Sequence, residues 1–176
     1  MLKKLLFLSG LILAFSVQAI FAQKEEASCG ISAWITDKDL NGLNVRNQPN
    51  VNGKVIAKLK TDGTEEDTVV IYVVGFSNGW VKIAKAENGK GQIFDDIGWV
   101  SAKMVETGTK GTPNYNSPIT MYAAAKTSSK KVGTIPSEDM VKIAGFSCGW
   151  VKVTYKGKTG WVRDVNICGN PFTTCS

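Results

Sequence analysis

The chain has 176 residues, of which 43% are hydrophobic and 20% charged, a composition typical of globular proteins and not of disordered ones. Its formal net charge of +6 comes from scattered lysines, without the clustered basic surface expected of a nucleic-acid-binding protein. The chain contains no histidine, which excludes Ser-His and Cys-His nucleophilic catalysis and, together with the absence of a close CxxC pair, argues against a zinc site.

The first residues of the chain have the organisation of an export signal. Two lysines precede the apolar run 5–17, and small residues follow at Ala19 and Ala22. This order predicts a secretory signal peptide over residues 1–22, cut after Ala22, with a cut after Ala19 as the alternative. The apolar run is short for a bilayer span, so an uncleaved anchor is the less favoured interpretation. We expect a secreted or periplasmic protein with no membrane span after signal removal.

The four cysteines predict disulfide bonds, because disulfides persist in the oxidising compartments that exported proteins reach. Four cysteines allow three pairings, and the sequence alone does not choose among them. We favour Cys148 with Cys168, within one unit of the chain, and Cys29 with Cys175, which would tie the tail to the start.

The chain then repeats itself. Residues 75–82 differ from their counterpart at only one of eight positions. Three segments recur in the same order: 54–59 as 130–135, 75–82 as 145–152, and 98–100 as 160–162. Three repeats in one order indicate two copies of one unit. The first copy carries an eight-residue insertion within 87–96, whose Gly, Asn and Asp content predicts a lengthened hairpin loop, either neutral or in contact with a ligand.

Each copy is predicted to consist of short strands. Residues 68–74 form a β-branched and aromatic run, 77–79 have turn chemistry, and a strand resumes at Trp80. Because side chains alternate along a strand, Val81 and Ile83 should face the core while Trp80 and Lys82 point to the opposite face. The second copy repeats this pattern, with Trp150 and Lys152 outward, and no helical period follows the signal.

The boundaries of the units follow from these repeats. A stretch rich in Gly, Thr, Asn and Pro separates the copies and is typical of a linker. The predicted parts are a signal peptide (1–22), an N-terminal segment (23–35), a first domain (36–105), a linker (106–118), a second domain (119–168) and a C-terminal tail (169–176).

The order of the motifs in the first copy resembles the bacterial SH3 (SH3b) domain family over residues 36–105. That family opens with a Leu-Asn-Val-Arg-Ser-type strand and continues with Val-Ile-x-x-Leu, Gly-Trp-x-x-Val and a closing Gly-Trp-Val. The first copy has all four segments, at 43–49, 55–59, 79–83 and 98–100. The second copy, over 119–167, keeps the last two segments but has Tyr122 in place of Arg46 and Ala125 in place of Pro49.

This resemblance implies an all-β fold of two tandem small SH3-like β-barrels. It further implies a non-enzymatic protein that binds a cell-wall peptide or glycan, or an envelope protein, with no cofactor, no metal and no nucleic acid. Such domains often accompany a wall hydrolase, but an NlpC-type peptidase needs a catalytic histidine. The acidic clusters at 65–67 and 95–96 offer no second catalytic partner type. A secreted adaptor or structural protein is the alternative function.

The candidate ligand-binding residues are the outward-facing aromatic and basic side chains. Trp80 and Trp150 match the tryptophan that lies in the ligand groove of the wider SH3 fold, and an indole suits stacking on a peptide or a sugar. Their alternative role is packing against the neighbouring unit. Arg46 either holds a carboxylate or braces its own loop. Lys82 and Trp99 complete the set, although Trp99, like Trp161 in the second copy, more naturally has a structural role. We expect Tyr72, Phe76 and Phe146 to pack in the core or in turns.

Overall fold

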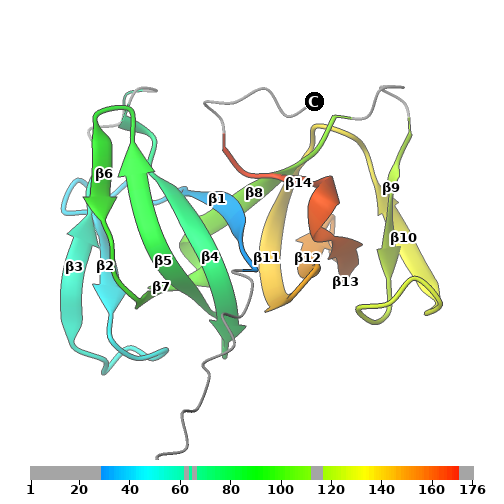
Figure 1. Ribbon diagram of the computed structural model, residues 1–176, viewed down its shortest axis with the longest axis horizontal. Coiled ribbons are helices and arrows are strands. Elements are labelled where there is room, and N and C mark those ends of the chain that lie inside the picture. The colour runs from blue at the N-terminus through cyan, green and yellow to red at the C-terminus, as the bar shows by residue number, and fades with distance from the viewer. Residues whose placement is uncertain (1–28, 62–63, 65–66, 112–116, 171–176) are drawn as a thin grey trace, which may run out of the picture.

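Figure 1 shows a computed structural model of the protein, which describes residues 29–61, 64, 67–111 and 117–170. The regular structure in these ranges is β-strand apart from short 3₁₀ helices, so the all-β prediction is confirmed. The predicted signal peptide, Cys175 and most of the predicted tail lie outside the described residues. Among those described, no helix has the length and apolar character needed to cross a membrane.

The strands form two groups joined through the middle of the molecule (Figure 1). The first half comprises β1 (Ile31–Ile35), β2 (Leu43–Arg46), β3 (Val55–Leu59), β4 (Val70–Ser77), β5 (Trp80–Asn88), β6 (Gly91–Phe94), β7 (Gly98–Ser101) and the 3₁₀ helix η2 (Ala102–Met104). The strand β8 (Val105–Thr109) follows. The second half comprises β9 (Ile119–Tyr122), β10 (Lys131–Ile135), β11 (Met140–Ser147), β12 (Trp150–Tyr155), β13 (Lys158–Arg163), the 3₁₀ helix η3 (Asp164–Asn166) and β14 (Ile167–Cys168).

The strand β8 belongs to both halves. In the first half β1 pairs with β4 and with β8, and in the second half β8 itself pairs with β11 and β14. The strand β8 is therefore the last strand of the first half and the first strand of the second half. Glu106 makes this explicit, because it is paired with Trp34 of β1 and with Lys142 of β11.

The shared strand corrects two predicted boundaries. Residues 106–109 were expected to start a linker, and β1 falls in what was expected to be an N-terminal segment outside the first domain, yet both are paired strands. The polar composition of β8 is compatible with burial because its threonine hydroxyls find acceptors. Thr107 donates to the Ser32 carbonyl at 3.0 Å, and Thr109 donates to the Pro136 carbonyl at 2.9 Å.

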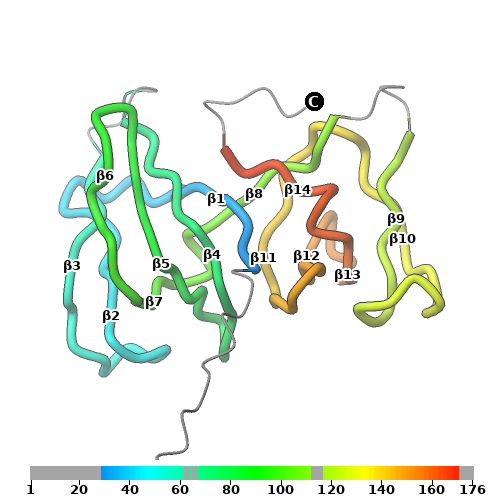
Figure 2. Tube along the Cα trace, viewed as in Figure 1, coloured from blue at the N-terminus to red at the C-terminus, as the bar shows by residue number. Residues whose placement is uncertain are grey.

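The core lies between the strands and runs through both halves as one apolar cluster. Val81 and Ile83 in β5, and their counterparts Val151 and Val153 in β12, are fully or almost fully buried, which confirms the predicted inward face. The chain trace in Figure 2 shows β1 and β8 between the two groups of strands, and the order of paired strands on the two sides is equivalent. Because the cluster is continuous, the two halves share one core.

Both halves contain the same irregularity. A bulge interrupts the β4–β5 register before Gly75 and the β11–β12 register before Gly145. The bulge shifts the alternation by one residue, so each glycine faces outward and the phenylalanine after it turns inward. Phe76 and Phe146 accordingly pack against the core, as expected from the sequence.

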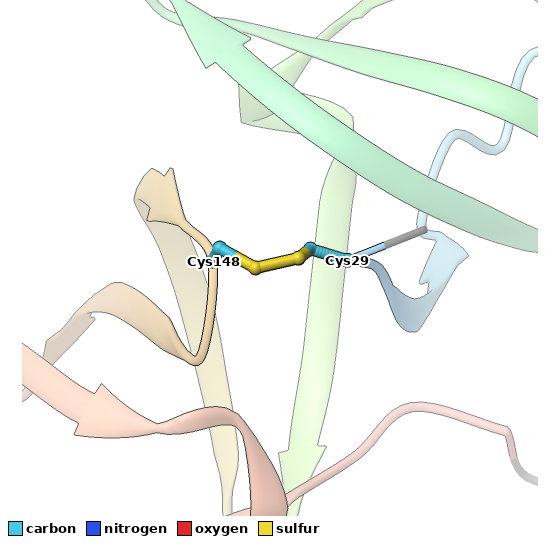
Figure 3. The surroundings of a disulfide bond; sticks show 2 residues. All are labelled: Cys29 and Cys148. Carbon is cyan, nitrogen blue, oxygen red and sulfur yellow. A yellow bond between two sulfur atoms is a disulfide. The ribbon is translucent and has the colours of Figure 1, made fainter. Parts of the chain in front are cut away.

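The disulfide in the described residues joins Cys29, just before β1, to Cys148, in the turn between β11 and β12 (Figure 3). The two Cα atoms are 5.2 Å apart. This pairing differs from the one favoured from the sequence. The reason is that β1 pairs with both β4 and β8 and so brings the start of the described chain beside the second half. Cys168 is also disulfide-bonded.

The insertion in the first half forms a hairpin, as predicted. The strand β5 continues to Asn88 and β6 pairs with it. The Asn88 side chain fixes the turn, because its Oδ1 accepts from the Lys90 amide at 3.0 Å and its Nδ2 donates to Asp67 at 2.6 Å. The hairpin leaves Ile93 and Ile97 exposed, as is Ile56 on β3.

Candidate ligand-binding face

The outer surface of the second half carries a group of aromatic and basic side chains. Residues directly opposite each other on paired strands point to the same side of the sheet. Register places Lys152 opposite Trp161, Trp161 opposite Tyr122, and Trp150 opposite Arg163. The residues between them are buried, so this group faces away from the core. We call it the second-half face: Tyr122, Trp150, Lys152, Trp161 and Arg163.

The side chains of the second-half face contact one another. The rings of Tyr122 and Trp150 meet edge to face with centroids 5.7 Å apart. The guanidinium carbon of Arg163 lies 5.5 Å from the centre of the Trp150 ring, and the Lys152 ammonium lies 6.0 Å from that of Trp161. Cation–ring contacts at exposed sites contribute about 0.5–1 kcal/mol each, enough to bias the long basic side chains toward one position.

Gly145 makes room for this arrangement. A Cβ atom at this position would lie 3.0 Å from the Lys152 Cβ and 3.7 Å from Cη2 of Trp161. The glycine therefore lets the lysine and the indole lie close to the backbone of β11. This close packing gives a steric reason for the glycine in the Gly-Phe dipeptide that occurs in both copies.

The structure brings four of the predicted site residues together on the first half. Lys82 lies opposite Trp99, Arg46 lies opposite Trp99 as well, and Trp80 lies opposite Ser101. They share an outer face, as the alternation predicts. Arg46, however, donates from Nη1 to the Gly53 carbonyl at 2.7 Å, which closes its own hairpin loop and corresponds to the bracing role. Among the described residues, no ring–ring or cation–ring contact involves Trp80 or Trp99.

Sequence reasoning selected Trp150 but missed its neighbours. Tyr122 was noted only as a departure from the family pattern, and Arg163 was not singled out. The internal repeat contained the information needed to find them. Tyr122 takes the place of Arg46, and Arg163 takes the place of Ser101, so both lie beside the repeated tryptophan pair. Trp161, like Trp99, was expected to be structural, and its contact with Lys152 places it on the face.

A second polar group braces the far end of β12. The Tyr155 hydroxyl donates to Asp139 Oδ2 at 2.5 Å, and this hydrogen bond holds the pKa of Asp139 below its usual value. The Lys156 ammonium lies 5.0 Å from the centre of the Tyr155 ring, and its interaction with Tyr155 raises the pKa of that lysine. Asp139 also holds the end of β8, because its backbone exchanges hydrogen bonds with Thr109. The role of this group is structural.

A cavity of about 380 Å³ lies where the halves meet. Its lining contains none of the predicted ligand-binding residues: it comprises Gly30, Ile31, Ser32, Tyr72, Asp164, Val165, Ile167, Cys168, Gly169 and Asn170. Tyr72, which was expected to be core or turn packing, lies over Gly30 here, and a Cβ on that glycine would collide with its ring. In the described parts of the chain, no three His, Cys, Asp or Glu side chains come together as a metal site.

Comparison with known proteins identifies one part of the chain. Residues 117–167 match the bacterial SH3 domain family. This range is the second half and contains the whole second-half face, whereas the sequence resemblance was strongest in the first half. A search of curated proteins found no match.

Two solved structures are similar to the chain at low identity. NlpC2 from Trichomonas vaginalis shares 15% identity with a TM-score of 0.34, over 80% of this chain and 48% of that one. NlpC1 from the same organism shares 15% identity with a TM-score of 0.34, over 81% of this chain and 46% of that one. The chain spans about half the length of these structures.

Proposed function

We propose that this protein is an exported, non-enzymatic binding protein that recognises peptidoglycan or another cell-envelope ligand. The observation that carries the proposal is the second-half face, a contacting group of rings and cations that lies within the residues matching the bacterial SH3 family. We further infer that the first half is a second copy of that domain, because its strands repeat the same pairings and the same bulge.

The chemistry of the face supports binding rather than reaction. Each indole offers a flat apolar surface and one N–H donor, a combination suited to the mixed polar and apolar surface of peptides and sugars. The chain has no histidine to act as a base, and the Asp139 carboxylate is engaged by Tyr155. The Cys29–Cys148 disulfide is in keeping with an oxidising, extracytoplasmic compartment.

Sedimentation with purified, insoluble peptidoglycan tests this proposal. We expect the wild-type protein to enter the pellet, Trp150→Ala to remain largely in the supernatant, and Leu40→Ala, at an exposed position far from the rings in sequence, to sediment like the wild type. Circular dichroism of each variant controls for folding. A wild-type protein that stays in the supernatant would refute wall binding, and clearing of a peptidoglycan zymogram would refute the non-enzymatic assignment.

A protein–protein adaptor is the second candidate function, and the insertion hairpin favours it. Ile56, Ile93 and Ile97 are 41–48% exposed on the first half, and exposed apolar patches mark protein–protein interaction sites. A photo-crosslinking amino acid at position 93 should capture an envelope protein in living cells if this surface has a partner. As a positive control, the same crosslinking amino acid is placed in the interface of another protein complex that is already characterised. If that control is captured and position 93 gives no adduct, the adaptor function is contradicted.

A further inference from the structure

We propose that the second-half face binds a carboxylate group, held between Arg163 and Lys152, at the end of a short peptide. The inference rests on the proposed function, because it names the ligand chemistry of the same face. It starts from the charge of that face, which carries two cations and no acid among its five members.

Neither cation forms an ion pair with another residue that the structure describes. Among the described residues, the ion pairs are Lys85 with Glu87 and Lys90 with Asp67, all in the first half. Asp164 follows Arg163 directly, but its Oδ1 accepts a hydrogen bond from the Val165 amide at 2.8 Å. Among the described residues, no ion pair joins this carboxylate to Arg163. The positive charge of the face is consequently left for a ligand.

The strand register lets both cations reach one group. Lys152 lies opposite Trp161 and Arg163 lies opposite Trp150, so the two basic residues are diagonal neighbours on adjacent strands. Diagonal neighbours on one face are about 7–8 Å apart at the backbone, a separation that long side chains bridge readily. A guanidinium binds a planar carboxylate with two parallel hydrogen bonds, and the ammonium adds a third contact.

The indole rings hold the two basic side chains in place, and this arrangement favours a peptide carboxylate over a stacked sugar. Arg163 rests on Trp150 and Lys152 on Trp161, so less side-chain entropy is lost when an anion binds. Each cation also covers part of an indole face, which leaves less open ring surface for a stacked sugar. The remaining apolar surface, completed by Tyr122, suits the small side chain next to a terminal carboxylate.

The first half provides the contrast that makes this assignment specific. Lys82 occupies the position of Lys152, but Ser101 stands where Arg163 stands, and Arg46 is bound to the Gly53 carbonyl. The first half therefore has one available cation where the second half has two. We expect its affinity for a carboxylate to be much weaker.

Titration of the full protein with N-acetyl-alanyl-alanine and with its C-terminal amide tests the inference, read from the tryptophan indole signals in nitrogen–proton NMR spectra. We expect the free acid to shift the Trp150 and Trp161 signals and the amide to bind at least about tenfold more weakly, a difference of about 1.4 kcal/mol. Arg163→Gln and Lys152→Gln should each weaken binding of the acid at least about tenfold. Lys82→Gln, the matched variant in the first half, should leave it unchanged.

Several results would overturn the inference. Equal binding of the acid and the amide would exclude carboxylate recognition, and a loss on Lys82→Gln but not on Lys152→Gln would place the site on the first half. Equal shifts with inorganic phosphate would show a general anion site. Sedimentation distinguishes a wrong carboxylate assignment from a wrong proposed function. If Arg163→Gln and Lys152→Gln still enter the peptidoglycan pellet, the protein binds the wall but not through a carboxylate held by these two residues.

Discussion

Apart from the insertion strand β6, the two halves have equivalent strand pairings, but they present different outer faces. In the first half, Arg46 lies opposite the closing tryptophan and reaches back to brace its own loop. In the second half Tyr122 lies there instead, and its ring meets Trp150 edge to face. Two exchanges, Tyr122 for Arg46 and Arg163 for Ser101, thus separate a self-contained loop from an assembled aromatic and cationic face. Two copies of a repeat can thus keep the same strand arrangement while only one of them carries a group of contacting aromatic and basic side chains.

The halves differ also in how their equivalent turns are used. Asn78 in the β4–β5 turn has a positive φ of 49°, a conformation that asparagine tolerates well. Its counterpart is Cys148, which is bonded to Cys29 at the start of the first half. The second turn is therefore an attachment point between the halves, whereas the first is a simple hairpin turn.

The largest effect should come from the strand that the halves share. Val105 is fully buried in β8, so Val105→Asp places an unpaired charge in the common core and should destabilise the protein by about 4 kcal/mol or more. Val51→Asp, at a site 72% exposed, should change stability by less than about 0.5 kcal/mol. Denaturant unfolding followed by tryptophan fluorescence should show one transition. Two transitions, with only one shifted by Val105→Asp, would mean that the halves are independent.

Removing the disulfide should have the next largest effect. The bond links residues 119 positions apart, so replacing both Cys29 and Cys148 with serine frees a long loop in the unfolded chain and should cost about 2–5 kcal/mol. The matched change Asn78→Ser at the equivalent turn should cost less than about 1 kcal/mol. Denaturation midpoints of the double variant and of Asn78→Ser measure both values. Similar losses in the two variants would contradict a linking role for the bond.

The outward glycines should respond unequally to a methyl group. In Gly145→Ala the new Cβ lies 3.0 Å from Lys152, tighter than the 3.3 Å that separates a Cβ at Gly75 from Lys82. Gly145→Ala should therefore be less stable than Gly75→Ala by about 1 kcal/mol, the lower end of the cost of overpacking. Thermal unfolding compares the two. The Trp161 indole signal should move only in Gly145→Ala, and an unmoved signal would show that the face does not depend on this glycine.

The smallest effect concerns pH. Because the Tyr155 hydroxyl lowers the pKa of Asp139, the interaction stabilises the fold above the unfolded pKa of about 3.9 and is lost as pH falls through the lowered folded value. Tyr155→Phe should therefore be less stable than the wild type at pH 6, and this difference in stability should narrow as the pH falls below the unfolded pKa of about 3.9. Melting temperatures across this range provide the measurement, and a difference that stays constant would exclude the Asp139 linkage.

The sequence determined the features that depend on near neighbours in the chain. Alternating apolar residues placed Val81 and Ile83 inside and Trp80 and Lys82 outside, because a strand reverses its side chains at every residue. The internal repeat and the turn residues likewise indicated an all-β chain with a lengthened hairpin at the insertion. These inferences required no knowledge of which strands pair.

Tertiary structure alone decided what depends on distant partners. The polar composition of β8 is typical of a linker, and only its pairing with strands on both sides makes it part of the core. The Cys29–Cys148 bond follows from that same crossing, since disulfide choice depends on which Cα atoms come within a few ångströms. The second-half face required the register that sets Tyr122 and Arg163 beside the tryptophans. Register is a property of paired strands, and no single stretch of sequence contains it.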